Sequence, residues 1–271
     1  MIERTMVMDK IKLYQIDAFT DAMFSGNPAA VCLLDSWIDD EVMKNIGSEN
    51  NLAETAFVVP QGKDYGIRWF TPTTEVDLCG HATLASAFVL FNLLHYQEPL
   101  IKFHSPRSGT LIVNKKEDLL MMDFPTDRLE LLPEEQNISF KSCIGLKPTE
   151  VYKGKTDYIA VIESEHELKY LHPDLNEISK LKARGLIVTA KGEQVDFVSR
   201  FFAPQTGIPE DPVTGSSHTS LLPLWSKKLG KTTFTARQLS KRGGRLICEY
   251  KGDRCLIGGN AKLYLTGEIN L

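Results

Sequence analysis

One carboxylate stands out in this sequence because its neighbours are apolar. Glu54 lies between Leu52-Ala53 and Ala56-Phe57-Val58, in a stretch that predicts a strand. A carboxylate in such surroundings is costly unless it is paired or functional, and a buried carboxyl group suits general acid–base work. Glu54 is therefore a candidate for proton transfer. The pattern is equally compatible with a glutamate that faces solvent or pairs with an arginine such as Arg68.

Two glycines that each open an apolar run offer a place for a negative ligand. Gly80-His81 and Gly215-Ser216 stand at these predicted helix starts. The first amides of a helix lack intrahelical partners and, with the helix dipole, suit a carboxylate or an enolate. His81 and Ser216 hold matching positions, and Asp211 precedes the second start as a second base or substrate anchor. The predicted substrate-binding residues are Gly80, Gly215 and Ser217.

Helix capping is the competing role for the polar side chains at these starts. We expect capping for Thr83 and Thr214. We expect it also for Ser217, in addition to that residue's predicted role in substrate binding. His218 is expected to be a packed or capping histidine rather than a ligand.

Cys79 raises a second chemical possibility. A thiol beside a helix N-terminus can act as a base or nucleophile. A racemase that uses two thiols needs a second cysteine, but the matching position is Thr214, and Cys248 and Cys255 lie far along the chain. We therefore prefer a buried, small residue at this position.

The elements that must position these residues occur twice. Arg68-Trp69-Phe70 followed by Asp77-Leu78-Cys79-Gly80 matches Arg200-Phe201-Phe202 followed by Asp211 to Gly215. A repeat of this length indicates duplication. The register continues at one constant offset, from Arg107, Gly109, Leu111, Ile112, Lys116 and Asp118 to Arg242, Gly244, Leu246, Ile247, Lys251 and Asp253.

The repeat predicts an α+β fold of two similar, pseudo-symmetric lobes. The helix expected over 81–94 is apolar nearly all round, so it should be buried on most sides. Short strands surround it and crossover helices are mostly missing, which favours a curled, mostly antiparallel sheet around a central helix. We expect an N-terminal lobe over 1–124, with a loose leader over 1–10, and a C-terminal lobe over 125–271 whose last strand can return to the first lobe.

Composition excludes several classes of function. A net charge of -4 among 271 residues argues against nucleic acid as the main partner. Five cysteines without a C-x-x-C pair indicate reduced thiols, and neither a disulfide framework nor a metal site is expected. No run is long and apolar enough for a membrane span, and no signal-peptide core is visible. We expect a cytoplasmic protein with no membrane partner.

The same residues carry a resemblance to a known family. From Lys12 onward the chain resembles the PhzF family of phenazine-biosynthesis-type isomerases. The motifs are Gln15-Ile16-Asp17-Ala18-Phe19-Thr20, Gly26-Asn27-Pro28-Ala29-Ala30-Val31, Asn51-Leu52-Ala53-Glu54-Thr55-Ala56-Phe57, Arg68-Trp69-Phe70-Thr71-Pro72, Gly80-His81-Ala82-Thr83 and Glu210-Asp211-Pro212-Val213-Thr214-Gly215-Ser216.

This resemblance implies a diaminopimelate-epimerase-like fold, cofactor-free proton transfer and a homodimer. By motif, Glu54 would be the acid–base, and His81, Asp211 and Ser216 would bind and polarise the substrate. In the best-understood members of the family the substrate is a dihydro-hydroxyanthranilate, a small carboxylated ring. Cys79 before Gly80 departs from many members and is similar to the cysteine-glycine of the epimerases.

Three functions follow as hypotheses. The first is a cofactor-independent isomerase that moves a proton within a small carboxylated metabolite by means of Glu54. The second is an amino or hydroxy acid epimerase or racemase that uses Cys79 or Glu54 with Asp211. The third is a non-catalytic protein of the same fold that binds a small molecule.

Overall fold

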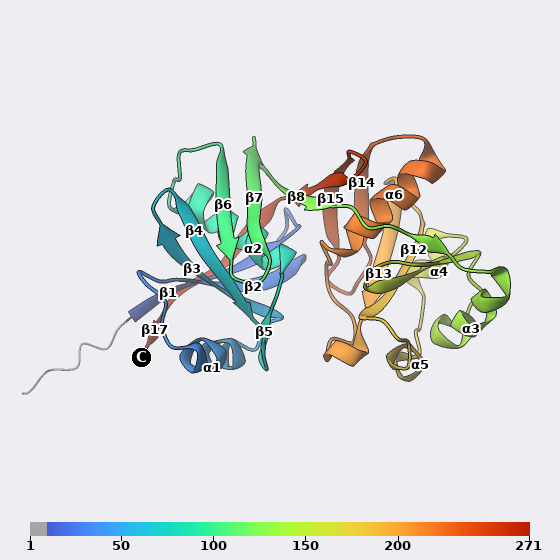
Figure 1. Ribbon diagram of the computed structural model, residues 1–271, viewed down its shortest axis with the longest axis horizontal. Coiled ribbons are helices and arrows are strands. Elements are labelled where there is room, and N and C mark those ends of the chain that lie inside the picture. Colours follow the sequence, from blue (N-terminus) through green and yellow to red (C-terminus); the bar gives the residue numbers. More distant parts are fainter. Residues whose placement is uncertain (1–9) are drawn as a thin grey trace, which may run out of the picture. The chain divides into compact units, whose positions relative to one another are not determined.

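The computed structural model describes residues 10–271, which form two compact units (Figure 1). Within the described residues, unit 1 comprises 10–18, Pro28–Lys115 and Ala261–Leu271. Unit 2 comprises Phe19–Asn27 and Lys116–Asn260. The leader expected over 1–10 lies outside the described residues, except for Lys10, which begins the first strand.

Unit 1 is built from strands joined mainly in antiparallel pairs around one buried helix. β2 runs parallel to β3, β4 is antiparallel to β3 and parallel to β6, and β1 pairs with the last strand of the chain. Its elements are β1 (Lys10–Ala18), β2 (Asn27–Leu33), α1 (Asp40–Asn50), β3 (Glu54–Gln61), β4 (Asp64–Phe70), β5 (Glu75–Val76), α2 (Gly80–Phe88), β6 (Leu100–Ser105), β7 (Gly109–Lys116) and β17 (Ala261–Asn270).

The predicted central helix of unit 1 is present and buried. Residues 81–87 of α2 are all buried, as expected for a helix that is apolar on every side. The helix expected over 81–94 is α-helical to Phe88 and continues as one π-helical segment, Val89–Leu93.

Unit 2 repeats this plan with more strands. β11 and β12 are parallel, as are β13 and β14, and the other pairs are antiparallel. Its elements are β8 (Leu119–Pro125), β9 (Glu130–Leu131), α3 (Glu134–Ile144), β10 (Glu150–Lys153), β11 (Asp157–Val161), α4 (Glu165–Lys169), α5 (Leu175–Ser179), β12 (Gly185–Lys191), β13 (Phe197–Phe202), a 3₁₀ turn (Pro204–Thr206), α6 (Ser217–Leu229), β14 (Thr233–Gln238), β15 (Gly244–Tyr250) and β16 (Arg254–Gly259).

The sequence repeat is visible in the strand pairing. In unit 1, β3–β4 is antiparallel, β4–β6 is parallel and β6–β7 is antiparallel. In unit 2, β12–β13, β13–β14 and β14–β15 follow the same order. α2 and α6 occupy the matching connections. The predicted α+β class of two similar lobes, each a curled, mostly antiparallel sheet, is therefore confirmed.

The lobe boundaries differ from those expected. β8 ends at Pro125, and it pairs with β16, so it belongs to unit 2 although the boundary was expected after residue 124. β17 pairs with β1 along its whole length and belongs to unit 1, which is the return to the first lobe that the sequence prediction allowed. The physical reason is that a strand belongs to the sheet with which it forms hydrogen bonds. The change in composition along the chain, on which the expected boundary rested, does not decide this.

Candidate active site

In unit 1, three buried side chains that are separated in sequence come together. Glu54 is the first residue of β3, Cys79 precedes α2, and His81 lies in the first turn of α2. His81 Nε2 lies 3.1 Å from Glu54 Oε2, and Cys79 Sγ lies 3.5 Å from His81 Nδ1. Within residues 10–271, Glu54 Oε2 has no partner in hydrogen-bond geometry. This buried oxygen is the atom of the carboxylate that pairs with His81.

The alternative roles considered for Glu54 are wrong. The residue is buried, so it does not face solvent. Arg68 makes a bidentate interaction with Glu75 instead, in which Nε and Nη2 donate over 2.7 and 2.9 Å, and it also pairs with Asp40. Glu54, the first residue of β3, therefore pairs with His81 and not with Arg68.

The surroundings set the charges of this cluster. Burial opposes a charge on His81, but the Cys79 sulfur and the Glu54 carboxylate outweigh it and raise the pKa of His81 well above its ordinary value. Burial, assisted by the Glu54 charge, raises the pKa of the Cys79 thiol to about 11. At neutral pH Cys79 is therefore the neutral thiol, and the protonated form of His81 is favoured.

We predict that His81 loses its proton only well above pH 6.5. Because its folded-state pKa is raised, the stability it contributes is complete below about pH 6.5 and is lost as pH rises through the folded-state pKa. Imidazole ¹⁵N shifts and thermal unfolding, followed from pH 6 to 10, measure both. Glu54→Gln should lower the His81 pKa, and titration of wild-type His81 at or below pH 6.5 would contradict this assignment.

The same three residues offer a metal ion one ligand atom each. These atoms lie within 4.8 Å of one another, and cysteine, histidine and glutamate are ligands that zinc accepts. Metal binding would require the thiolate of Cys79, so it would release the proton that the thiol otherwise holds to high pH. The sequence did not predict this cluster, because Glu54 lies far along the chain from the Cys79-Gly80-His81 segment and the three residues do not have the spacing of a known metal-binding motif. The absence of a metal stays a prediction.

In unit 2, Asp211 lies in a buried hydrogen-bond network. Its Oδ1 accepts from Asn27 Nδ2 over 2.8 Å, and its Oδ2 accepts from Thr214 Oγ1 over 2.5 Å. Gln238 Nε2 donates to the Asp211 carbonyl, and Gln238 Oε1 accepts from the Thr214 amide. Both oxygens are held as acceptors, which suits a fixed negative charge. Asn27 and Gln238 were missed as site residues, although Asn27 stands in the Gly-Asn-Pro turn.

Ser216 is held by an arginine that sequence reasoning also missed. Arg184 Nη1 donates to Ser216 Oγ over 3.0 Å. Arg184 is fixed in turn by the buried carboxylate of Asp157, to which its Nε donates over 2.9 Å, and it lies over the Phe201 ring. No feature of the sequence around Arg184 predicts this contact, because it depends on β12 and the start of α6 being neighbours.

The expected helix caps are wrong. Cys79 and Ser216 occupy the N-cap positions, and neither side chain makes a capping bond. Thr83 Oγ1 donates to the Cys79 carbonyl, and Thr214 Oγ1 donates to the Asp211 carboxylate. Ser217 Oγ is buried with no hydrogen-bond partner among the described residues. None of these hydroxyls accepts a hydrogen bond from a helix amide of the described residues. The amides that follow Gly80 and Gly215 are therefore not occupied by side-chain caps.

His218 is a packed residue, as expected. It is fully buried, its Nδ1 lies 3.0 Å from the Thr214 carbonyl oxygen, and its ring lies 5.8 Å from that of Phe197. Burial lowers the pKa of His218 to about 4, so the side chain is neutral at physiological pH.

Comparison with known proteins places the chain in a family. Residues 16–267 match the family model described as phenazine biosynthesis-like protein, PhzC-PhzF. The chain is 48% identical, over 97% of its length and 100% of the relative, to an uncharacterized isomerase of Pseudomonas aeruginosa. The chain belongs to this phenazine biosynthesis-like (PhzF) family, and the expected resemblance is confirmed.

Solved structures agree with this placement. A PhzF family protein of Enterococcus faecalis superposes with a TM-score of 0.91 at 47% identity, over 97% of this chain and 100% of that one. A hydroxyproline epimerase of Agrobacterium vitis shares the fold alone, with a TM-score of 0.59 at 9% identity over 97% and 93%. In the described part of the chain, no helix has the length and apolar character needed to cross a membrane.

Proposed function

We propose that this protein is a cofactor-independent isomerase, in which Glu54 removes a proton from a small carboxylated metabolite and returns it to another carbon. The observation that carries the proposal is the buried Glu54 carboxylate, whose Oε2 lies 3.1 Å from His81 Nε2. The names of the relatives as isomerases support the reaction class.

The charge on His81 suits the start of the reaction. An imidazolium at His81 places a positive charge beside the Glu54 carboxylate, and it can polarise the substrate through its ring. When Glu54 holds the proton, His81 still provides a positive charge for the electrons that move into the substrate's unsaturated system. The proton then returns at a different carbon, so substrate and product have the same composition.

The residues of unit 2 suit binding and polarisation. The Asp211 carboxylate accepts two hydrogen bonds, which makes it a fixed anchor for a substrate donor rather than a mobile base. Ser216 Oγ accepts from Arg184, so its own hydroxyl proton can be donated to a substrate oxygen. We assign the carboxylate-binding amides to the segments at Gly80, Gly215 and Ser217. We also propose that the protein is a homodimer in the cytoplasm.

The epimerase hypothesis receives less support. Burial keeps Cys79 a thiol at neutral pH, and a thiol is a poor base. Its nearest titratable neighbour is His81, which the proposal already uses.

Hydrogen exchange in heavy water tests the proposed reaction and identifies its substrate. The protein is incubated with a metabolite extract in deuterium oxide, with and without EDTA, and the products are separated by mass spectrometry. We expect a carboxylated metabolite to gain one mass unit and to convert to an isomer at the same rate in both samples. Binding without exchange would favour the non-catalytic alternative. Exchange at one carbon with inversion would favour the epimerase, and loss of exchange with EDTA would favour a metal.

A further inference from the structure

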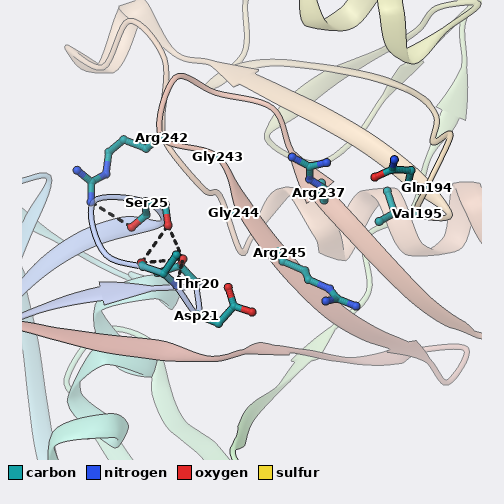
Figure 2. Close-up of a pocket in the computed structure, with 11 residues that line it drawn as sticks. Thr20, Asp21, Ser25, Gln194, Val195, Arg237, Arg242, Gly243, Gly244 and Arg245 are labelled. Carbon is teal, nitrogen blue, oxygen red and sulfur yellow. Dashed lines mark hydrogen bonds between the residues drawn. The ribbon is translucent and has the colours of Figure 1, made fainter.

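Unit 2 contains an open cavity that none of the residues assigned to proton transfer lines. Its volume is about 440 Å³, within the range of small-molecule sites. The loop after β1, the turn between β12 and β13, and strands β14 and β15 form its walls (Figure 2). Three arginines line it, Arg237, Arg242 and Arg245, against one acidic lining residue, Asp21.

Two of these arginines stand directly opposite one another. Arg237 on β14 is the register partner of Arg245 on β15, so both side chains leave the same face of the sheet. Like charges in this position destabilise an antiparallel pair. Neither side chain makes a hydrogen bond or an ion pair with residues 10–271, and both are exposed. An anion between them would remove the repulsion.

The wall of the cavity is fixed in place. Arg242 donates to the carbonyls of Ser25 and Gly26, and the Gly26 amide donates to the Gly243 carbonyl. The loop after β1 is thereby tied to the turn between β14 and β15, the two strands that carry the cavity's other arginines (Figure 2). At Gly244 a Cβ would lie 2.3 Å from Val213 Cγ2, so only glycine allows this approach. The cavity is therefore present before any ligand binds.

We propose that this cavity binds a small, non-aromatic polyanion whose charges lie on phosphate or carboxylate oxygens. Guanidinium groups pair with both kinds of oxygen in bidentate geometry, and Arg237 and Arg245 present two such groups from paired positions on β14 and β15. None of the described residues that line the cavity is aromatic, so they offer a nucleotide base no aromatic ring to stack on. The ligand class is thus a phosphorylated or multiply carboxylated aliphatic metabolite, and the site is independent of Glu54 chemistry.

Calorimetric titration of the full chain with inorganic pyrophosphate and with citrate, at low ionic strength, tests the proposal and separates the two oxygen sources. We expect saturable one-to-one binding of at least one of them. R237Q and R245Q should each weaken it about tenfold, since each removes one charge-assisted pair. R128Q is the matched control, because Arg128 is an exposed arginine of unit 2 outside the cavity, and it should bind as the wild type does.

A second measurement separates binding from folding. Without ligand, R237Q and R245Q should unfold at the same temperature as the wild type or higher, because each relieves the opposed charges. Pyrophosphate or citrate should then raise the unfolding temperature of the wild type and R128Q more than that of either variant. Absence of saturable binding by both anions, or equal weakening in R128Q, would overturn the proposal.

Discussion

Glu54→Gln should reduce proton exchange by roughly 10²- to 10⁴-fold, the contribution usual for a positioned general acid–base. Glutamine keeps the size of the side chain but cannot accept and return a proton. The substitution also removes the negative charge that lies 3.1 Å from His81 Nε2. The rate of deuterium incorporation into the substrate identified in heavy water measures the loss.

The matched control is Glu49→Gln, which changes an exposed glutamate of α1 in the same unit. It should exchange at the wild-type rate. Both variants should retain the far-ultraviolet circular dichroism of the wild type, because glutamine has the size and shape of glutamate. Full exchange by Glu54→Gln would remove Glu54 from the mechanism.

Asp211→Ala should both destabilise the protein and abolish exchange. The carboxylate accepts from two buried donors, Asn27 Nδ2 and Thr214 Oγ1. Its removal leaves buried polar groups short of partners, at a cost of about 1–3 kcal/mol in the free energy of unfolding. Thermal unfolding measures this change, and Asp253→Ala, at an exposed aspartate of the same unit, should leave the unfolding temperature unchanged.

Asp211→Asn separates the charge of this residue from its structural role. The amide oxygen can still accept from Asn27, and the amide nitrogen can donate to the Thr214 hydroxyl, which also accepts hydrogen bonds. We therefore expect wild-type stability with reduced exchange. Wild-type exchange in this variant would show that the negative charge of Asp211 has no part in the reaction.

Local sequence patterns predicted a large part of the fold and of the candidate site. The apolar neighbours of Glu54 marked it as a candidate site residue but left its burial open, whereas the buried α2 follows from a run without a polar face. The repeat predicted two lobes, and the matching order of strand pairs in units 1 and 2 confirms them. Periodicity and repetition are properties of the chain itself, so they can be recognised before any contact is known.

Other features depend on contacts between distant segments, which spacing along the chain does not encode. The pairing of β8 with β16 and of β17 with β1 decided the division into units. Folding also brought Cys79 and His81 to Glu54, and Arg184 to Ser216. The opposition of Arg237 and Arg245 depends on a register that either strand alone leaves open. Charges and burial at these positions therefore follow from tertiary packing, because each group's neighbours come from elsewhere in the chain.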